Sequence, residues 1–395
     1  MRILVLNDYA SGGGAEVVVD DEARLLREAG HVVRVLSGED CGGPPGPIGY
    51  VHNRRACRAV RRAIADLDPD VVHAHNVYHV LSPAVLGTVA AIRDASEAAG
   101  RGRRPRLVMT AHDFHLVCPN SGCCSFPRGG RRIEDPADWH RWSPAMALRA
   151  MRTRWDHRSA WRSWAKLLQH AWSHRVRRLR TAPDVIACPG AAAAARLRAG
   201  GVEAVVLPNP FVPAGDRPSA PPAARSARLV FAGRVEPEKG LVELLRIWPA
   251  NRGLDVYGDG SARAEAEAEA QRRGIADRVR FHGAVPRAAV VDAVAASAAL
   301  VMASRSPESA PVVLLEALAT GTPVVVPDLG GMAEAVAETG AGRTFTPDDA
   351  ASLARAVAEA TAMRVDRDDP RVADALRRRD ESSHLAGLLA LYRGH

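Results

Sequence analysis

Short apolar runs alternate with longer helical patterns along almost the whole chain, and this alternation constrains the fold more than any other feature. Helical patterns lie at residues 15–29 and 54–67. The apolar runs between such patterns predict buried parallel strands, because strands that are covered on both faces are apolar throughout. In the first half these runs are residues 3–6, 32–36, 71–75, 107–111, 185–187 and 205–207. Strands that alternate with helices predict a doubly wound parallel sheet.

A proline-rich segment, residues 208–227, then interrupts the pattern, and its prolines and small residues favour a linker. After it the alternation restarts. Strands are predicted at 229–232, 254–257, 279–282, 300–303, 323–326 and 343–345. Helices are predicted at 241–248, 262–273, 287–296, 312–319 and 350–360.

The restart predicts an α/β protein with two Rossmann-like domains that face a central cleft. We expect an N-terminal domain over 1–207, a linker over 208–227 and a C-terminal domain over 228–379. A last helix at about 380–395 is expected to pack back on the first domain. In open sheets of this kind, ligands bind at the carboxyl ends of the strands. Candidate functional residues are therefore sought in the loops that follow strands.

The composition argues against several other classes. Apolar residues make up 47% of the 395 residues, and no apolar run reaches the roughly 18 to 20 residues that span a bilayer. The N-terminal run stops at Asn7 and Asp8, which indicates a first strand and not a signal peptide. Six cysteines are few for this length and suit a reducing compartment. The expected location is the cytoplasm.

The net charge of +8 comes from one segment. Residues 141–180 hold eleven basic side chains against the single acid Asp156, so the rest of the chain sums to −2. This concentration argues against a nucleic-acid-binding protein with basic residues along its length. Six of the seven tryptophans lie between residues 139 and 172.

The basic, tryptophan-rich segment 139–180 leaves three interpretations open. Its helical pattern places one group of apolar side chains on a common face: Trp161, Trp164, Leu168 and Trp172. A basic amphipathic helix can lie on an anionic membrane surface, as a peripheral contact at the inner face of the membrane. The same helix can cover an acceptor site, or pack its aromatic side chains into the core.

Two glutamates, Glu308 and Glu316, bracket an uncharged stretch that runs from a loop into a predicted helix. Pro311 suits the first turn of that helix, and the free amides of Ala310 and Val312 are placed to bind a phosphate. An acid beside such a site can hold the hydroxyls of a ribose or a sugar. The spacing fits a nucleotide sugar, but it also fits an acid that favours the helix dipole and an ordinary surface glutamate.

A second stretch, "LVFAGRVEPEKG", places Arg234 and Lys239 in a loop directly after a predicted strand. Two cations at the carboxyl end of a strand can stabilise the charge that develops on a diphosphate leaving group. Two solvated loop cations would give the same pattern.

Taken together, these stretches resemble glycosyltransferase family 4, the retaining GT-B group of enzymes. The resemblance rests on Gly233-Arg234 and Lys239-Gly240, "VYGDGS", "VRFHGAV", the two glutamates and "GTPVVVPDLGGMAEAV". The first half contributes "ASGGGAE", "DVVHAHN", "TAHDF" and "VLPNPF". The chain departs from the family in one place, where "ESAP" stands for the more usual "EGFG", and this leaves the donor sugar open.

The resemblance implies roles for particular residues. In the second half, Arg234 and Lys239 would bind the diphosphate with the amides of Ala310 and Val312, while Glu308 would contact the donor sugar and Glu316 the ribose. The backbone near Gly283 and Val285 would hold the base. In the first half, Gly13 and Gly14 would let the diphosphate or the acceptor approach the backbone. His112 would contact the donor sugar near the reacting carbon. His75 and Asp113 would line the acceptor side.

The implied reaction transfers a sugar from a nucleoside-diphosphate sugar, first of all a UDP-sugar, to a hydroxyl of a glycan, lipid-linked or small-metabolite acceptor. The resemblance implies retention of the anomeric configuration. Because the sequence offers no carboxylate nucleophile for a double displacement, we expect front-face attack. No metal and no cofactor beyond the donor is expected, because the acidic motifs at 66–68 and 366–369 lie outside strand-to-helix loops.

Alternatives from other classes are a nucleotide-sugar epimerase on a similar fold and a nicotinamide-dependent oxidoreductase. "SGGGAE" lacks the glycine spacing that the latter needs. A zinc site at Cys118, Cys123 and Cys124, or a metal at His73 and His75, is also conceivable, but paired C-x-x-C spacing is absent.

Overall fold

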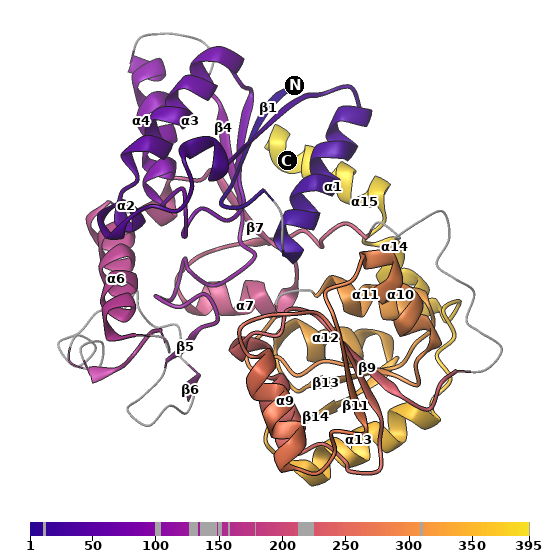
Figure 1. Cartoon of the computed structure of the whole chain (residues 1–395). Coiled ribbons are helices and arrows are strands. Elements are labelled where there is room, and N and C mark those ends of the chain that lie inside the picture. The colour runs from indigo at the N-terminus through magenta and orange to yellow at the C-terminus, as the bar shows by residue number, and fades with distance from the viewer. Residues whose placement is uncertain are drawn as a thin grey trace. The chain divides into compact units, whose positions relative to one another are not determined.

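The computed structural model describes residues 1–10, 13–98, 104–125, 133–134, 148, 152–156, 159–177, 179–211, 225–308 and 311–394. The chain forms two compact units (Figure 1). Unit 1 comprises Met1–Pro210 together with the C-terminal stretch Glu381–His395, and unit 2 comprises Phe211–Asp380. The segment expected to be a linker lies mostly outside the described residues.

Unit 1 is an α/β unit built around one parallel sheet. In chain order its named elements are β1 (Arg2–Asn7), α1 (Gly14–Glu28), β2 (Val32–Ser37), α2 (Pro47–Val51), α3 (Arg54–Leu67), β3 (Val71–Ala74), α4 (Ala84–Ala98), β4 (Arg106–Thr110), β5 (Cys124–Ser125), β6 (Ile133–Glu134), α6 (Ala160–Ala171), β7 (Val185–Cys188), α7 (Ala191–Ala199), β8 (Val205–Val206) and α15 (Glu381–Arg393). The six strands of the main sheet follow the order β2-β1-β3-β4-β7-β8 and are parallel.

The central strand β1 of unit 1 is apolar on both sides because helices cover both faces of the sheet. Along β1, Leu4 and Leu6 enter a core that also includes residues of α3 and α4. The alternate residues Ile3 and Val5 enter a separate core with residues of α1 and α15. Successive strand side chains point to opposite faces, so a continuous apolar run serves two cores at once.

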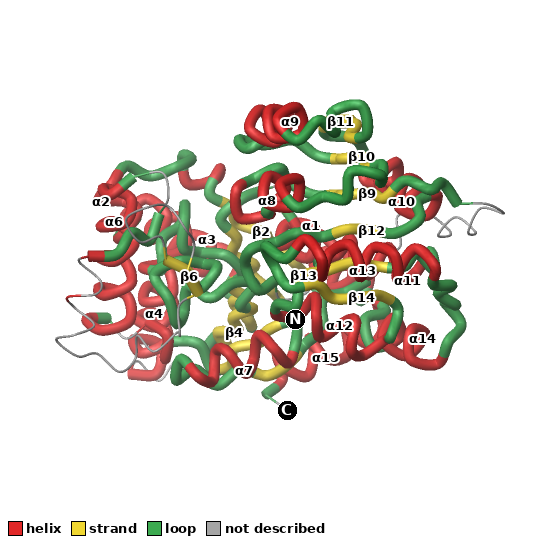
Figure 2. The backbone as a smooth tube through the Cα atoms, turned by 90° about the horizontal axis from the view of Figure 1, so that it is seen from below, coloured by secondary structure: helices red, strands yellow, loops and turns green. Residues whose placement is uncertain are grey.

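Unit 2 repeats this architecture. Its named elements are β9 (Leu229–Ala232), α8 (Leu241–Arg246), β10 (Leu254–Tyr257), α9 (Arg263–Arg272), β11 (Val279–Gly283), α10 (Arg287–Ala296), β12 (Leu300–Val301), α11 (Val312–Ala319), β13 (Val324–Pro327), α12 (Gly330–Thr339), β14 (Gly342–Phe345), α13 (Ala350–Ala362) and α14 (Pro370–Arg377). The parallel sheet has the order β11-β10-β9-β12-β13-β14, and Figure 2 shows these strands one above another in that order.

The predicted fold class is confirmed: the structure has two parallel six-stranded sheets, each covered by helices. Every predicted strand is present, and α3, α10 and α11 have the predicted bounds. The prediction omitted α2, α4, α7, α12, α14 and the short strands β5 and β6. The run of five alanines that begins α7, for example, has no amphipathic period, and in the structure the helix packs against β7 and β8. Among the described residues, no helix is long and apolar enough to cross a membrane.

Candidate active-site residues

In unit 2, two neighbouring strands place their following loops side by side. The loop after β9 and the loop after β12 are joined by a hydrogen bond from the Arg305 amide to the Glu238 carbonyl, 2.9 Å long. Gly240 has φ +70°, and a Cβ there would overlap the carbonyl oxygen of Ala303. Glycine at this position therefore allows the two loops to approach each other closely.

This approach brings together two of the predicted site residues. Lys239 Nζ donates to Glu308 Oε1 at 2.7 Å, and the Ser304 hydroxyl donates to the same oxygen. The Lys239 and Glu308 side chains are 27% and 16% exposed, so the pair is partly desolvated. The chain contains two lysines, Lys166 and Lys239, among 53 basic residues. Lys239 is the lysine of the predicted diphosphate site. The second cation expected there, Arg234, is exposed and pairs with Glu238 at 3.3 Å.

The second glutamate is buried and has a cationic partner. Glu316 is 5% exposed within α11, and Arg287 Nε donates to its Oε1 at 2.6 Å. Burial raises the pKa of Glu316, while the hydrogen bond and charge of Arg287 oppose that rise. Arg287 begins α10 directly after the loop that contains Val285, so the pair joins the end of β11 to α11.

The strand ends next to this loop are closely packed. Gly283 ends β11 with φ +74°, and its carbonyl accepts from the Gly258 amide at 2.8 Å. A Cβ on Gly258 would overlap the carbonyl oxygen of Gly233. Close backbone contacts therefore join the carboxyl ends of β9, β10 and β11, and the rings of Tyr257 and His282 stack beside them with centroids 4.4 Å apart.

The expected phosphate-binding amides are only partly described. Val312 begins α11, and Pro311 occupies the cap position before it and not the first turn. The Pro311 carbonyl accepts from the Leu314 amide at 3.1 Å. Ala310, to which a phosphate contact was also assigned, lies outside the described residues.

In unit 1, the loops after β3 and β4 bring two predicted histidines together. His75 Nδ1 and His112 Nε2 are 2.9 Å apart, and their rings are stacked. His75 is fully buried, so it contacts His112 from within the domain. Burial, assisted by His75, lowers the pKa of His112 to about 3, so His112 is a neutral imidazole at physiological pH.

Asp113 has a partner within its own loop. It accepts hydrogen bonds from the His115 amide at 3.0 Å and contacts His115 Nδ1 at 2.8 Å. Burial alone would raise the pKa of Asp113, but the charge and hydrogen bonds of His115 lower it to about 2.

The two glycines at the start of α1 differ in their surroundings. A Cβ on Gly13 would meet the carboxylate of Glu16, whereas nothing lies within 4 Å of one on Gly14. A side chain at position 13 would therefore collide with a side chain of α1, the helix that follows. The roles expected for both glycines stay predictions.

Two buried acids in unit 1 were not predicted from the sequence. Asp8, at the end of β1, accepts from the backbone amides of His79, Val80 and Leu81 at 2.7 to 2.9 Å. Burial raises the pKa of Asp8 to about 6 despite these bonds. Asp8 could have been identified from the sequence, because it is an acid that directly follows the first strand. Glu22, in the middle of α1, gave no such signal.

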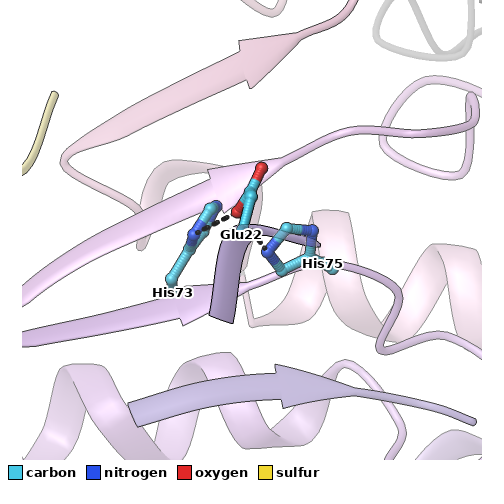
Figure 3. Close-up of side chains that lie close together, drawn as sticks. All are labelled: Glu22, His73 and His75. Carbon is cyan, nitrogen blue, oxygen red and sulfur yellow. Dashed lines mark ion pairs between the residues drawn. The ribbon is translucent and has the colours of Figure 1, made fainter. Parts of the chain in front are cut away.

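Two groups among the described residues have metal-ligand geometry: Glu22 with His73 and His75, and His79 with Asp113 and His115. Figure 3 shows Glu22 of α1 between the imidazoles of His73, in β3, and of His75, directly after it. As predicted, His73 and His75 lie on one side of their strand, with ring centroids 4.1 Å apart.

The three clustered cysteines belong to the packing of a turn around Asn120. Cys118, Cys123 and Cys124 are buried, and Asn120 contacts the sulfur atoms of Cys118 and Cys124 and donates to the Trp155 carbonyl at 2.7 Å.

Two doubly wound parallel-sheet units in one chain are the architecture of GT-B glycosyltransferases. Residues 12–214 match the family described as Glycosyltransferase Family 4, and residues 216–373 match Glycosyl transferases group 1. The chain belongs to glycosyltransferase family 4.

Relatives and solved structures agree with this assignment. The D-inositol 3-phosphate glycosyltransferase of Streptomyces griseus is 38% identical over 167 residues, which are 36% of this chain and 35% of that protein. The chain thus spans about a third of the length of the curated relatives it matches. Sucrose-phosphate synthase from Thermosynechococcus elongatus superimposes with a TM-score of 0.67 at 17% identity, over 100% of this chain and 98% of that one. Anabaena HepE in complex with UDP and glucose gives 0.62 at 19% identity, over the whole of both chains. At these identities the two structures show the same fold.

Proposed function

We propose that this protein is a retaining glycosyltransferase that moves a sugar from a nucleoside-diphosphate sugar to a hydroxyl of a glycan, lipid-linked or small-metabolite acceptor. The observation that carries the proposal is the ion pair between Lys239 and Glu308, at the carboxyl ends of two neighbouring strands. Family membership supports a transferase over a nicotinamide-dependent oxidoreductase. UDP is the first candidate for the leaving group, because HepE was solved with UDP and glucose.

In this proposal the Lys239–Glu308 pair is the resting arrangement of the site. An incoming diphosphate competes with Glu308 for the ammonium group of Lys239, and Arg234 adds a second cation. Glu308 is then released to accept hydrogen bonds from the hydroxyls of the donor sugar. Glu316, held by Arg287, is oriented toward the ribose.

The proposed chemistry is a front-face displacement. The bond between the anomeric carbon and the diphosphate oxygen breaks, and the acceptor oxygen bonds to the same face of that carbon. The departing phosphate oxygen takes the proton of the acceptor hydroxyl. Lys239 and Arg234 stabilise the charge on the diphosphate as it leaves, without a requirement for a metal ion.

Thermal stabilisation by ligands tests the donor half of this proposal. We expect one nucleoside diphosphate, among UDP, GDP, ADP and dTDP, to raise the melting temperature equally with and without EDTA. Release of that diphosphate from its sugar conjugate should then require an acceptor. A shift with NAD(H) alone would contradict the proposal, and interconversion of donor sugars without an acceptor would support the epimerase.

We further propose that α6 brings the acceptor side of unit 1 to an anionic membrane surface, at the inner face of the membrane. The helix presents its apolar side chains outward: Trp161, Trp164 and Leu168 are 56%, 52% and 61% exposed. Core packing, one of the three interpretations, does not hold for these three residues. Trp172, from the same predicted face, packs partly on the core and contacts His52. Trp139 and Trp142 lie outside the described residues.

The side of α6 that faces the protein carries two hydrogen-bonded polar side chains, Ser163 and Gln169, beside Leu167, which packs against the core. Gln169 donates to the carbonyls of Tyr50 and Tyr78 at 2.6 and 2.7 Å. The Ser163 hydroxyl accepts from the amides of Trp155 and Asp156. These bonds fix the rotation of the helix, so its apolar face stays turned to the surroundings.

The charge around α6 complements an anionic surface. Arg152, Arg154, Arg162 and Arg177 are exposed. Tryptophan side chains favour the boundary between lipid and water, and nearby arginines are attracted to anionic head groups. Both features support a lipid surface over a protein partner.

Vesicle sedimentation tests the membrane contact. Burial of about 100 Å² on each of Trp161 and Trp164 contributes about 2.5 kcal/mol per side chain at about 25 cal/mol per Å². The double replacement by alanine should therefore weaken binding to vesicles that contain phosphatidylglycerol by at least about 100-fold. Replacing Val205 and Val206, which are exposed on β8, by alanine is the matched control. Equal binding of all three proteins would refute the contact.

A further inference from the structure

A buried polar network lies beneath His112 and connects it to α1 and α15. Glu22 Oε2 lies 3.3 Å from His75 Nε2 and 3.5 Å from His73 Nδ1, as Figure 3 shows. Glu22 Oε1 lies 3.1 Å from His384 Nε2 on α15. All four side chains are buried, so each proton in the network must have a defined place.

His384 is the residue of this network whose protonation state follows directly from its two hydrogen-bond partners. Its Nδ1 lies 2.8 Å from the Pro208 carbonyl, and its Nε2 faces Glu22. A carbonyl only accepts, and so does an ionised carboxylate; both ring nitrogens of His384 therefore carry protons. Although burial opposes its charge, these partners raise the pKa of His384. Burial likewise opposes the charge of Glu22, but the surrounding histidines lower its pKa well below the usual value.

An ionised Glu22 determines which nitrogen of His75 carries a proton. Glu22 Oε2 and His75 Nε2 are buried 3.3 Å apart, and neither atom has a hydrogen-bond partner among the described residues. A proton on His75 Nε2 satisfies both atoms. His75 Nδ1 then carries a lone pair, which accepts from His112 Nε2 at 2.9 Å. A neutral His112 that donates from Nε2 has its lone pair on Nδ1.

We propose that Glu22 and His75 are positioning residues that hold His112 in the tautomer with its lone pair on Nδ1. His112 then accepts a hydrogen bond from a ligand and does not donate one. If His112 contacts the donor sugar, which rests on the proposed function, its partner is a sugar hydroxyl that donates. His112 does not supply a proton to the leaving group in this state.

The same cluster has ligand atoms that a metal ion would use, but His73 argues for the hydrogen-bonded network. Its Nδ1 lies 2.8 Å from the Tyr392 hydroxyl, and its Nε2 lies 2.8 Å from the Thr110 hydroxyl. Both nitrogens of His73 thus have hydroxyl partners, which donate or accept as required. A metal ion would have to displace Tyr392 from the buried core.

Nitrogen NMR of histidine-labelled protein tests the proposal without any ligand or turnover. The His112 signals are identified by their loss in His112→Gln. In the wild-type protein we expect His112 to carry its proton on Nε2. In Glu22→Gln, the charged His384 should take the new amide oxygen, which leaves the amide NH2 facing His75. The amide then donates to His75 Nε2, and the proton on His112 moves to Nδ1. Glu28→Gln, an exposed change on the same helix, should leave the His112 spectrum unchanged.

Each outcome decides the proposal. A His112 proton on Nδ1 in the wild type overturns it, and so does a His112 tautomer that Glu22→Gln does not alter. If Glu22→Gln fails to fold, the wild-type spectrum still decides. One bound zinc per chain, lost in Glu22→Gln, would replace the network with a metal site. Failure of the proposed function would appear as absent sugar transfer, which these spectra do not measure.

Discussion

Lys239→Met removes one ammonium group from the candidate diphosphate site and keeps a side chain of similar length. With 2.7 Å between Lys239 Nζ and Glu308 Oε1, the gross attraction is roughly 6 kcal/mol at an effective dielectric constant of about 20. Desolvation of both groups cancels most of this energy. We therefore expect the free energy of unfolding to fall by only about 1–2 kcal/mol, so the variant should fold.

The larger effect is expected on the reaction. Loss of a preorganised cation beside developing charge raises a barrier by about 3–4 kcal/mol, which is a decrease of about 10²- to 10³-fold in kcat. Lys239→Arg keeps the charge and should restore activity in part. Full recovery is not expected, because a planar guanidinium group does not reproduce the compact ammonium group of Lys239.

Release of the nucleoside diphosphate at saturating donor and acceptor measures this effect. Arg343→Met, which breaks an exposed 2.6 Å ion pair with Glu359 in the same unit, is the matched control and should retain the wild-type rate. A folded Lys239→Met protein with a rate within about threefold of wild type would refute the role of Lys239 in transfer.

Two further perturbations test other groups. Glu316→Gln should weaken nucleoside-diphosphate binding by about tenfold in calorimetry, through loss of about 1.4 kcal/mol, whereas Glu359→Gln should not; equal affinities would argue against a ribose contact. The raised pKa of Asp8, about 6 against 3.8, means that the folded state binds its proton more tightly than the unfolded state. Its contribution to stability is therefore lost as pH rises from about 4 to 6, by about 3 kcal/mol relative to Asp8→Asn. If the difference in unfolding free energy between the wild-type protein and Asp8→Asn did not change with pH across that range, this reasoning would be contradicted.

Much of the fold was predictable because the local pattern and the tertiary environment agree. The apolar runs at β1 and β9 read as two-faced strands, and in the structure their alternate residues enter separate cores. The helix bounds of α10 and α11 were predictable because a proline precedes each helix and small residues or glycine follow. The α7 segment has the same flanking signals, Pro189 before it and Gly200 after it, but its run of alanines has no amphipathic period, and the helix was not predicted.

The candidate site likewise has residues that were predictable from the sequence and residues that were not. Residues in the loops that follow strands, such as Lys239, Glu308 and His112, were identified from their position and from the family motifs. Their partners were not. Arg287 begins a different helix from Glu316, and no local pattern indicates that the two side chains meet. The outward orientation of Trp161 and Trp164 was also undetermined, because a helical period shows that side chains share a face and not which way the face points.

The sequence by itself determined the two sheets, the strand-end loops and the residue types that those loops carry. These features follow from periodicity and turn chemistry, which act over a few residues. Only the tertiary structure decided that Glu22 of α1, His75 directly after β3 and His384 of α15 form one buried network with His112. Glu22 and His384 are 362 residues apart. Their pairing depends on the packing of α15 against α1 beside the sheet, where burial requires every charge and proton to have a partner.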